Sequence, residues 1–153
     1  MSSPIELQQY LHDHIPLSIA MQVAVVAVSD DAVVLRAPLA PNTNHHATIF
    51  GGSASALAIL AAWSLLHTRL TNHSVPARLV IQRNTMEYER AISSDFTARS
   101  FLPGPANWPR FLNTLARKGK ARIEVAATLE ARGEITGRFT GEFVAFTSNA
   151  SSA

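Results

Sequence analysis

The chain has no cysteine among its 153 residues, which excludes disulfide bonds and thiolate chemistry. No Lys or Arg precedes Arg36, so we do not expect a signal peptide with a basic start. The longest almost wholly apolar segment, 54–66, is shorter than the roughly 20 residues that a bilayer span requires. These absences favour a cytoplasmic protein with no membrane partner, and the length suits a single domain over residues 1–153.

Acidic residues are missing from two long stretches, 32–86 and 96–123. The second stretch is basic and carries Arg99, Arg110, Arg117, Lys118, Lys120 and Arg122. Such a stretch suits a phosphate-bearing ligand or an acidic partner, although a solvated basic face explains it equally well. No aromatic–basic interleaving accompanies these charges, so we predict no nucleic-acid partner.

Hydrophobic periodicity predicts three helices and six strands. The helices are expected at 4–14, at about 53–70, and from a cap at Asn107 to Gly119. The strands are expected at 18–28, 32–39, 77–90, 94–102, 122–132 and 135–143. Residues 148–153 are expected to form a frayed tail.

The last two strands give the clearest pattern, because apolar and polar residues alternate along both of them. A turn at Gly133-Glu134 would join them into an antiparallel hairpin with one buried face. In this pattern Ile135 belongs with the apolar set and Thr136 with the polar set. The helix at 53–70 is apolar on nearly every side, which predicts burial on most sides. An α+β architecture, with a curved antiparallel sheet of about six strands around that helix, satisfies both demands.

A polar loop, 42–50, runs into Gly51-Gly52-Ser53 at the start of this helix. Glycine allows a ligand to approach the backbone closely, and the first N–H groups of a helix lack intrahelical partners. They also lie at the positive end of the helix dipole. This turn is therefore predicted to bind an oxygen that becomes anionic during a reaction. The alternative is that the glycines only permit tight packing.

The loop resembles the substrate loop of hotdog-fold thioesterases, in which Asn, Thr and Gly-Gly precede the central helix. Asn44, Thr48, Gly51 and Gly52 fall at the matching places. Phe50 stands where many of those proteins have His, and with the downstream Trp63 it resembles the YiiD C-terminal-like thioesterases more closely. The resemblance extends over about residues 15–146.

This resemblance implies a hotdog fold and hydrolysis of acyl thioesters carried by coenzyme A or by an acyl carrier protein. It also implies a homodimer or a dimer of dimers with sites between subunits. No cofactor is expected. No metal site is predicted either, because His45 and His46 have no third ligand at suitable spacing and 12–14 lies on a different element.

The candidate catalytic residues all lie in or beside this loop. Asn44 is predicted to orient the thioester or water, or else to be a turn residue. His45 and His46 are candidate general bases, and adjacent side chains in an extended loop would point opposite ways. Thr48 and Ser53 could donate hydrogen bonds near the thioester, although Ser53 could equally cap the helix.

One departure from the family pattern concerns the general base. Many hotdog thioesterases place a carboxylate seven residues after the second glycine, where this chain has Ile59. The base is then a loop histidine, a partner group, or a strand carboxylate, for which the candidates are Glu87, Glu89 and Asp95. Without one, the protein would bind thioesters without hydrolysing them. A hydratase or dehydratase is less favoured, because that chemistry needs an acid–histidine pair near the helix.

The candidate substrate-binding residues are partly aromatic and partly basic. Phe50 and Trp63 could line an acyl tunnel beside the central helix or belong to the core. The residues that could cover the mouth of that tunnel are Trp108, Phe111 and Leu112. The residues that could bind phosphates of coenzyme A or an acidic carrier surface are Arg117, Lys118 and Lys120.

Overall fold

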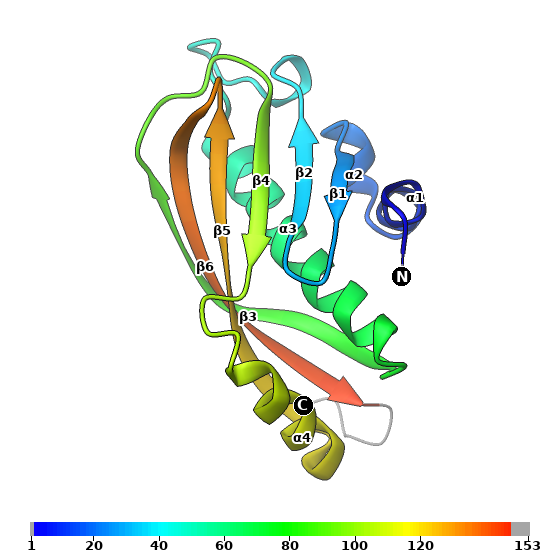
Figure 1. Ribbon diagram of the computed structural model, residues 1–153. Coiled ribbons are helices and arrows are strands. Elements are labelled where there is room, and N and C mark those ends of the chain that lie inside the picture. The colour runs from blue at the N-terminus through cyan, green and yellow to red at the C-terminus, as the bar shows by residue number, and fades with distance from the viewer. Residues whose placement is uncertain (1, 148–153) are drawn as a thin grey trace.

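A six-stranded antiparallel sheet curves around one long helix in the computed structural model, which describes residues 2–147 (Figure 1). The predicted tail at 148–153 lies outside the described residues. The helices are α1 (Pro4–His14), α2 (Pro16–Ala20), the 3-10 turn η1 (Ala40–Asn42), α3 (Gly51–Asn72) and α4 (Asn107–Lys118). The strands are β1 (Ala24–Val28), β2 (Val33–Ala37), β3 (Ala77–Tyr88), β4 (Phe96–Phe101), β5 (Lys120–Ala131) and β6 (Glu134–Thr147).

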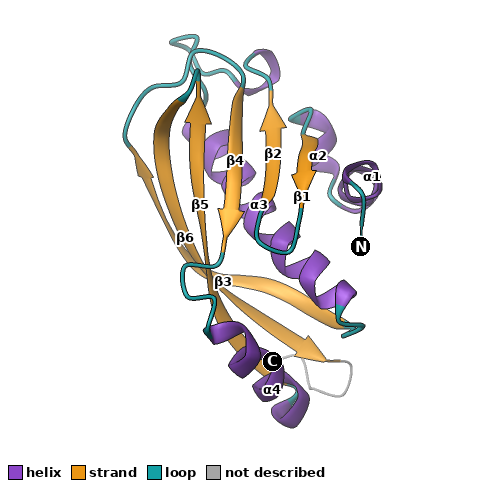
Figure 2. Ribbon diagram, viewed as in Figure 1, coloured by secondary structure: helices purple, strands orange, loops and turns teal. Residues whose placement is uncertain are grey.

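The strand order is β1-β2-β4-β5-β6-β3, and every neighbouring pair is antiparallel. Figure 2 shows α3 lying along the concave face of the sheet, with α1 beside β1 and α4 at the bottom of the view. This is the hotdog arrangement, so the predicted α+β fold is confirmed.

The central helix α3 is buried on most sides, as its composition predicts. It packs against β2, β4 and β5, and its fully buried residues include Leu57, Ala61 and Leu65. One stripe at four-residue spacing is only half-buried. It consists of Ser55, Ile59, Trp63 and His67. Because residues four apart share a helix face, α3 presents this stripe away from its own sheet.

The predicted strand at 18–28 is wrong in its first part. Residues 16–20 form α2, and the strand begins only at Ala24. Pro16 has a ring-fixed φ that suits the first position of a new helix. The Ser18 hydroxyl donates a 2.7 Å hydrogen bond to the carbonyl of Ile15, which closes that short helix.

Two predicted helix caps are also wrong. Helix α3 begins at Gly51 with Phe50 in the capping position, so Ser53 lies inside the first turn and does not cap. Helix α4 likewise begins at Asn107 itself, after Ala106, without a side-chain cap. The predicted end of α4 is confirmed, because Gly119 adopts a left-handed φ of 71°.

The predicted β5–β6 hairpin is present, but its turn lies one residue earlier than expected. Arg132 and Gly133 have φ values of 52° and 78°, which together form the two-residue turn. The alternation is wrong at the start of β6, where a β-bulge interrupts the pairing with β5. As a result Ile135 is 38% exposed, whereas Thr136 is only 5% exposed.

A column of four rings joins α1 to α3. Tyr10 stacks on His14 and on His67, with ring centroids 4.1 and 4.6 Å apart, and His67 stacks on Trp63 at 4.6 Å. Burial, and to a smaller extent the charge of His14, holds the pKa of His67 below its ordinary value of 6.5. The folded protein therefore favours the neutral form of His67.

This pKa shift predicts a loss of stability on acidification. Above pH 6.5 His67 is neutral in both states, and as the pH falls below 6.5 the unfolded chain takes up its proton more readily. We expect the melting temperature to fall between about pH 7.5 and about pH 5.5, and to fall less in His67→Phe, which keeps the ring without its titration. His46→Gln, in an exposed loop, is the control. Equal pH dependence in the wild type and His67→Phe would contradict the prediction.

Candidate functional site

The loop before α3 is anchored at both ends by Asn42. This residue is 2% exposed, and its side-chain Nδ2 donates to the carbonyls of Met21 and Pro38 at 3.0 and 2.8 Å. Its own carbonyl accepts a 2.8 Å hydrogen bond from the N–H of Phe50. The loop is therefore closed onto the end of β2 and held at the helix start.

Asn44 and Thr48 hold the tip of this loop. The Asn44 Oδ1 accepts from the N–H groups of His46 and Thr48 at 2.8 and 3.2 Å, and its Nδ2 lies 2.9 Å from the Thr48 hydroxyl. Ala47 between them has a φ of 60°. The polar groups of both side chains are used within the loop, so their direct effect here is to shape the turn.

The two loop histidines do not point opposite ways. The rings of His45 and His46 are 3.8 Å apart at their centroids, and both residues are exposed. The expectation of opposed side chains is wrong because 44–48 is a tight turn, bridged at its base by Thr43 and Ile49, and not an extended segment.

The N-terminus of α3 offers unpaired backbone donors. The first intrahelical bond runs from the N–H of Ala54 to the carbonyl of Phe50. The N–H groups of Gly51, Gly52 and Ser53 have no acceptor among residues 2–147. They lie at the positive end of a helix of 22 residues, where a developing negative charge is stabilised.

Phe50 lies across this helix start. Its ring is in contact with Gly52, so that a Cβ at Gly52 would come within 2.3 Å of the Phe50 Cε2. Phe50 is nevertheless 56% exposed. On the other side, the Tyr88 hydroxyl donates a 3.1 Å hydrogen bond to the carbonyl of Gly51. Glycine at position 52 thus permits an aromatic ring to approach the backbone donors.

A cavity of about 310 Å³ adjoins the first turn of α3. Its wall combines that turn, the loop end, the chain after β3 and the facing part of the β5–β6 hairpin. The lining residues are Ile49, Gly51, Ala54, Tyr88, Glu89, Arg90, Ala91, Ile92, Leu129 and Thr136. The inner wall is mostly apolar, and Glu89 is the carboxylate in this lining.

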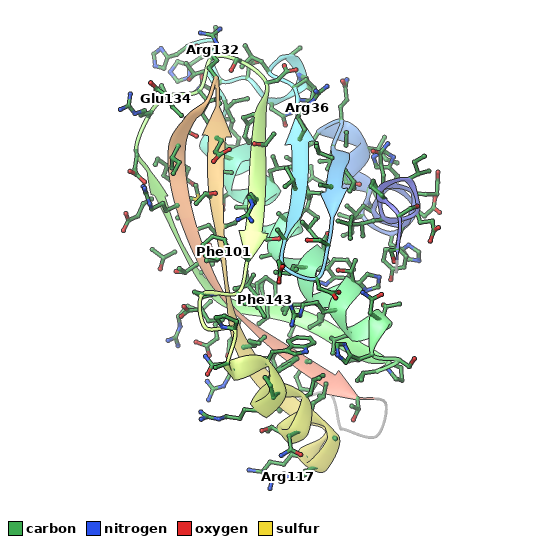
Figure 3. All side chains as sticks on the ribbon, in the orientation of Figure 1. Arg36, Phe101, Arg117, Arg132, Glu134 and Phe143 are labelled. Atoms are coloured by element: carbon green, nitrogen blue, oxygen red, sulfur yellow. The ribbon has the colours of Figure 1, made fainter. Side chains whose placement is uncertain are left out.

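Backbone hydrogen bonds and ion pairs to other parts of the chain hold the segment 89–92 in place. The N–H groups of Glu89 and Arg90 both donate to the carbonyl of Thr136, at 2.9 and 3.1 Å, and Ile49 donates to Ile92 at 2.8 Å. Glu89 forms an ion pair with Arg138. A second ion pair joins Arg90 and Glu134 at 3.1 Å, at the end of the molecule where Figure 3 labels Glu134.

The other candidate residues lie elsewhere. Glu87 is exposed on β3 outside the cavity, and Asp95 lines a separate cavity of about 210 Å³ with Arg36 and Arg132. Trp63 is twelve positions after Gly51, roughly 18 Å along the helix, and belongs to the ring column. Ile59 is half-buried in the middle of α3.

Helix α4 lies far from the cavity within the same chain. Figure 3 shows Arg117 at one tip of the molecule, with Arg132 and Glu134 at the other. Arg117, Lys118 and Lys120 are exposed there. The apolar residues of α4 pack inward, with Trp108 and Phe111 buried and Leu112 half-buried. Phe111 also borders a cavity of about 290 Å³ between α4 and the hairpin.

Two kinds of feature are absent from the part of the chain that the structure describes. Within residues 2–147 there is no group of three or more His, Cys, Asp or Glu side chains placed to hold a metal ion. No helix in that range is long and apolar enough to cross a membrane.

A family model and several solved structures match this chain. A family model described as a putative thioesterase, the yiiD C-terminal family, matches residues 5–147. The structure is similar to a putative thioesterase from Shewanella oneidensis, with a TM-score of 0.84 and 27% identity over 94% of this chain and 96% of that one. It is also similar to a protein of unknown function from Chlorobaculum tepidum, with a TM-score of 0.87 and 26% identity over 95% and 94%. A thioesterase from Haemophilus influenzae shares the fold at 12% identity, with a TM-score of 0.76 over 100% and 96%.

Proposed function

This chain belongs to the yiiD C-terminal family of putative thioesterases, and on that premise we propose that it hydrolyses acyl-CoA or acyl-carrier-protein thioesters at the start of α3. The observation that carries the proposal is the combination of unpaired N–H groups at Gly51–Ser53 with a cavity that contains one carboxylate, Glu89. Donors for an oxyanion and a base for water are the two elements that thioester hydrolysis needs.

In the proposed reaction, water adds to the thioester carbonyl while Glu89 accepts the proton of that water. The carbonyl oxygen becomes an oxyanion, and the N–H of Gly52 donates a hydrogen bond to it. The tetrahedral intermediate then collapses, the carbon–sulfur bond breaks, and the thiolate takes the proton from Glu89. The products are the free acid and the thiol. Gly51 and Ser53 supply neighbouring donors.

Glu89 is preferred as the base because of its position. Among the candidates His45, His46, Glu87, Glu89 and Asp95, it is the one that lines the cavity beside α3. Its pairing with Arg138 holds the side chain at the cavity wall. The two loop histidines remain the alternative, because they lie in the loop that leads directly into Gly51.

A thiol-release assay tests this proposal directly. Purified protein would be incubated with acyl-CoA thioesters of increasing length, and with the same acyl groups on an acyl carrier protein, and free thiol would be measured. Faster hydrolysis of the thioesters on one carrier than of those on the other identifies the substrate class. Saturable binding without thiol release would overturn hydrolysis and favour the second candidate, a thioester-binding protein, for which Ile59 at the usual acid position is the specific observation.

We also propose that the active unit is a homodimer. Strand β3 ends the sheet and pairs with β6 on one side, and among residues 2–147 no strand pairs with its other backbone edge. It is 12 residues long and largely exposed, and a long open edge is a template for pairing with another chain. A molecular mass near 16.5 kDa by light scattering would contradict the proposal.

Such a dimer gives the basic end of α4 a function in the partner's site. In antiparallel pairing, the Ala77 end of one β3 lies beside the Tyr88 end of the other. Lys120 begins β5 opposite Phe146, next to the Ala77 end, so α4 would approach the cavity of the second copy. Basic side chains there could hold the phosphates of coenzyme A or an acidic carrier surface.

This arrangement predicts a salt-dependent affinity for the carrier. The apparent affinity for acyl-CoA should drop as salt rises, because the Debye length falls from ~10 Å at 0.1 M to ~3 Å at 1 M. We expect a smaller drop in the triple variant Arg117→Ser, Lys118→Ser, Lys120→Ser. Arg99→Ser, an exposed basic residue on β4, is the matched control. Equal affinity and equal salt dependence in the wild type and the triple variant would show that the basic end of α4 is solvated and does not bind the carrier.

A further inference from the structure

The peptide unit between Gly51 and Gly52 carries the carbonyl of the first residue and the N–H of the second. Because a trans peptide is planar, these two groups point in opposite directions, and fixing the direction of one fixes the direction of the other. The Gly52 N–H has no acceptor among residues 2–147, and Phe50 before the helix supplies no side-chain cap. The direction of this N–H therefore depends on what holds the Gly51 carbonyl.

Tyr88 holds that carbonyl from the end of β3. Its hydroxyl donates a 3.1 Å hydrogen bond to the carbonyl oxygen of Gly51, across a sequence separation of 37 residues. A carbonyl in the first turn of a helix accepts from the N–H four residues later and keeps a second lone pair, so it can accept both bonds. The Tyr88 ring lies alongside the glycine, since its Cε1 would be 3.5 Å from a Cβ at position 51.

The backbone that carries the Tyr88 ring is fixed by the sheet. Tyr88 pairs with Gly137 of β6, and the N–H of the next residue, Glu89, donates to the carbonyl of Thr136 at 2.9 Å. The Tyr88 side chain itself is 58% exposed, so packing in the core does not account for an aromatic residue here. Its hydrogen bond to the helix start links a rigid part of the sheet to the Gly51–Gly52 peptide.

A donor at a carbonyl oxygen changes the N–H of the same peptide. The bond draws electron density toward the oxygen and raises the double-bond character of the C–N bond, which leaves the N–H more positive and a stronger donor. The bond also limits rotation of a unit that has glycine, with its wide conformational freedom, on both sides. A donor that is already oriented costs no reorganisation when an oxyanion forms.

We propose that Tyr88 is a positioning residue for the hydrolysis, because its hydroxyl orients and polarises the peptide whose N–H binds the oxyanion. This inference rests on the proposed function, in which the Gly52 N–H is that donor. Tyr88 acts through the Gly51 carbonyl and needs no contact with the substrate. Its contribution is therefore confined to the transition state, where the oxyanion exists.

The kinetic test is Tyr88→Phe, which keeps the ring at the edge of β3 and removes only the hydroxyl. We expect kcat for acyl-CoA hydrolysis to fall about three- to tenfold, the range that one neutral hydrogen bond represents. KM should change less than about twofold, because an interaction made only in the transition state lowers kcat and kcat/KM equally. Tyr10→Phe removes the other phenol hydroxyl of the chain, on α1, and is the matched control.

A double-mutant cycle distinguishes action through the peptide from contact with the substrate. In the Gly52→Pro background there is no N–H to orient, so adding Tyr88→Phe should have little further effect on kcat. An equal fold-loss in both backgrounds would place the hydroxyl on the substrate and overturn the inference. An unchanged kcat in Tyr88→Phe, beside an active wild type, would also overturn it and leave the proposed function standing. A wild type that releases no thiol would instead overturn the proposed function.

An NMR measurement tests the contact without any substrate. Labelling with ¹⁵N-glycine gives a spectrum of only seven backbone amides, and the signal that disappears in Gly52→Ala identifies Gly52. Its ¹⁵N resonance should shift in Tyr88→Phe and stay in place in Tyr10→Phe, because only the first variant removes the bond that polarises this peptide. An unshifted Gly52 resonance in Tyr88→Phe would overturn the inference.

Discussion

Gly52→Pro should reduce the turnover number about 100-fold or more while leaving the protein folded. Proline has no N–H, so the substitution removes the donor that we assign to the oxyanion. Removal of one such donor in comparable sites lowers kcat by about 10²–10³-fold. The fold should persist because Gly52 is in the first turn of α3, where its N–H has no acceptor among the described residues and proline is tolerated.

The effect of the lost donor must be separated from the displacement of Phe50. Any side chain at position 52 meets the Phe50 ring, which would lie 2.3 Å from a new Cβ. Gly52→Ala displaces the ring but keeps the N–H, so we expect it to retain most of the turnover. The double variant Phe50→Ala, Gly52→Ala removes the collision as well. Circular dichroism would confirm folding, and full activity in folded Gly52→Pro would reject the assignment.

The architecture could be predicted from the sequence because burial imposes patterns that a chain shows directly. The apolar circumference of 54–66 requires cover on most sides, and period-two alternation in the last hairpin requires a sheet with one buried face. These two demands are satisfied by the same packing, with α3 on the concave face. Helix boundaries are harder to predict from the sequence, because Pro16 serves equally well to end one helix and to begin the next.

The site could be predicted only as a region. The Gly51-Gly52 pair is visible in the sequence because two adjacent glycines directly before a long apolar helix allow a close approach to its first N–H groups. The pairing of Asn44 with Thr48 is not visible, since it depends on how a turn closes. Glu89 and Tyr88 reach the cavity only because the sheet brings the end of β3 beside α3.

Thr136 illustrates what a pattern cannot supply. The alternation in β6 places it among the polar residues, and that assignment is correct for Arg138 and Thr140. A bulge shifts the phase by one residue, and nothing in the local sequence signals the shift. The side chain that is redirected toward the interior is therefore the one that periodicity misplaces.

The substitution Glu89→Gln should lower kcat about 10²–10⁴-fold, the range that a positioned general base contributes. The amide keeps the size of the side chain and loses the ability to accept a proton from water. Stability should change little, because the ion pair with Arg138 is partly solvated, with side-chain exposures of 53% for Arg138 and 38% for Glu89, and such pairs contribute about 0–1 kcal/mol. The measurement is single-turnover thiol release, which isolates the chemical step from product release.

Two control variants make this result specific. Glu87→Gln removes an exposed carboxylate two residues earlier, outside the cavity, and should leave turnover near that of the wild type. Arg138→Met breaks the ion pair but keeps the Glu89 carboxylate, so its loss should be smaller than that of Glu89→Gln. If Glu89→Gln keeps full turnover, the base is another group, and separate His45→Ala and His46→Ala variants become decisive. Because their rings lie 3.8 Å apart, a loss in only one of them would identify the ring that faces the substrate.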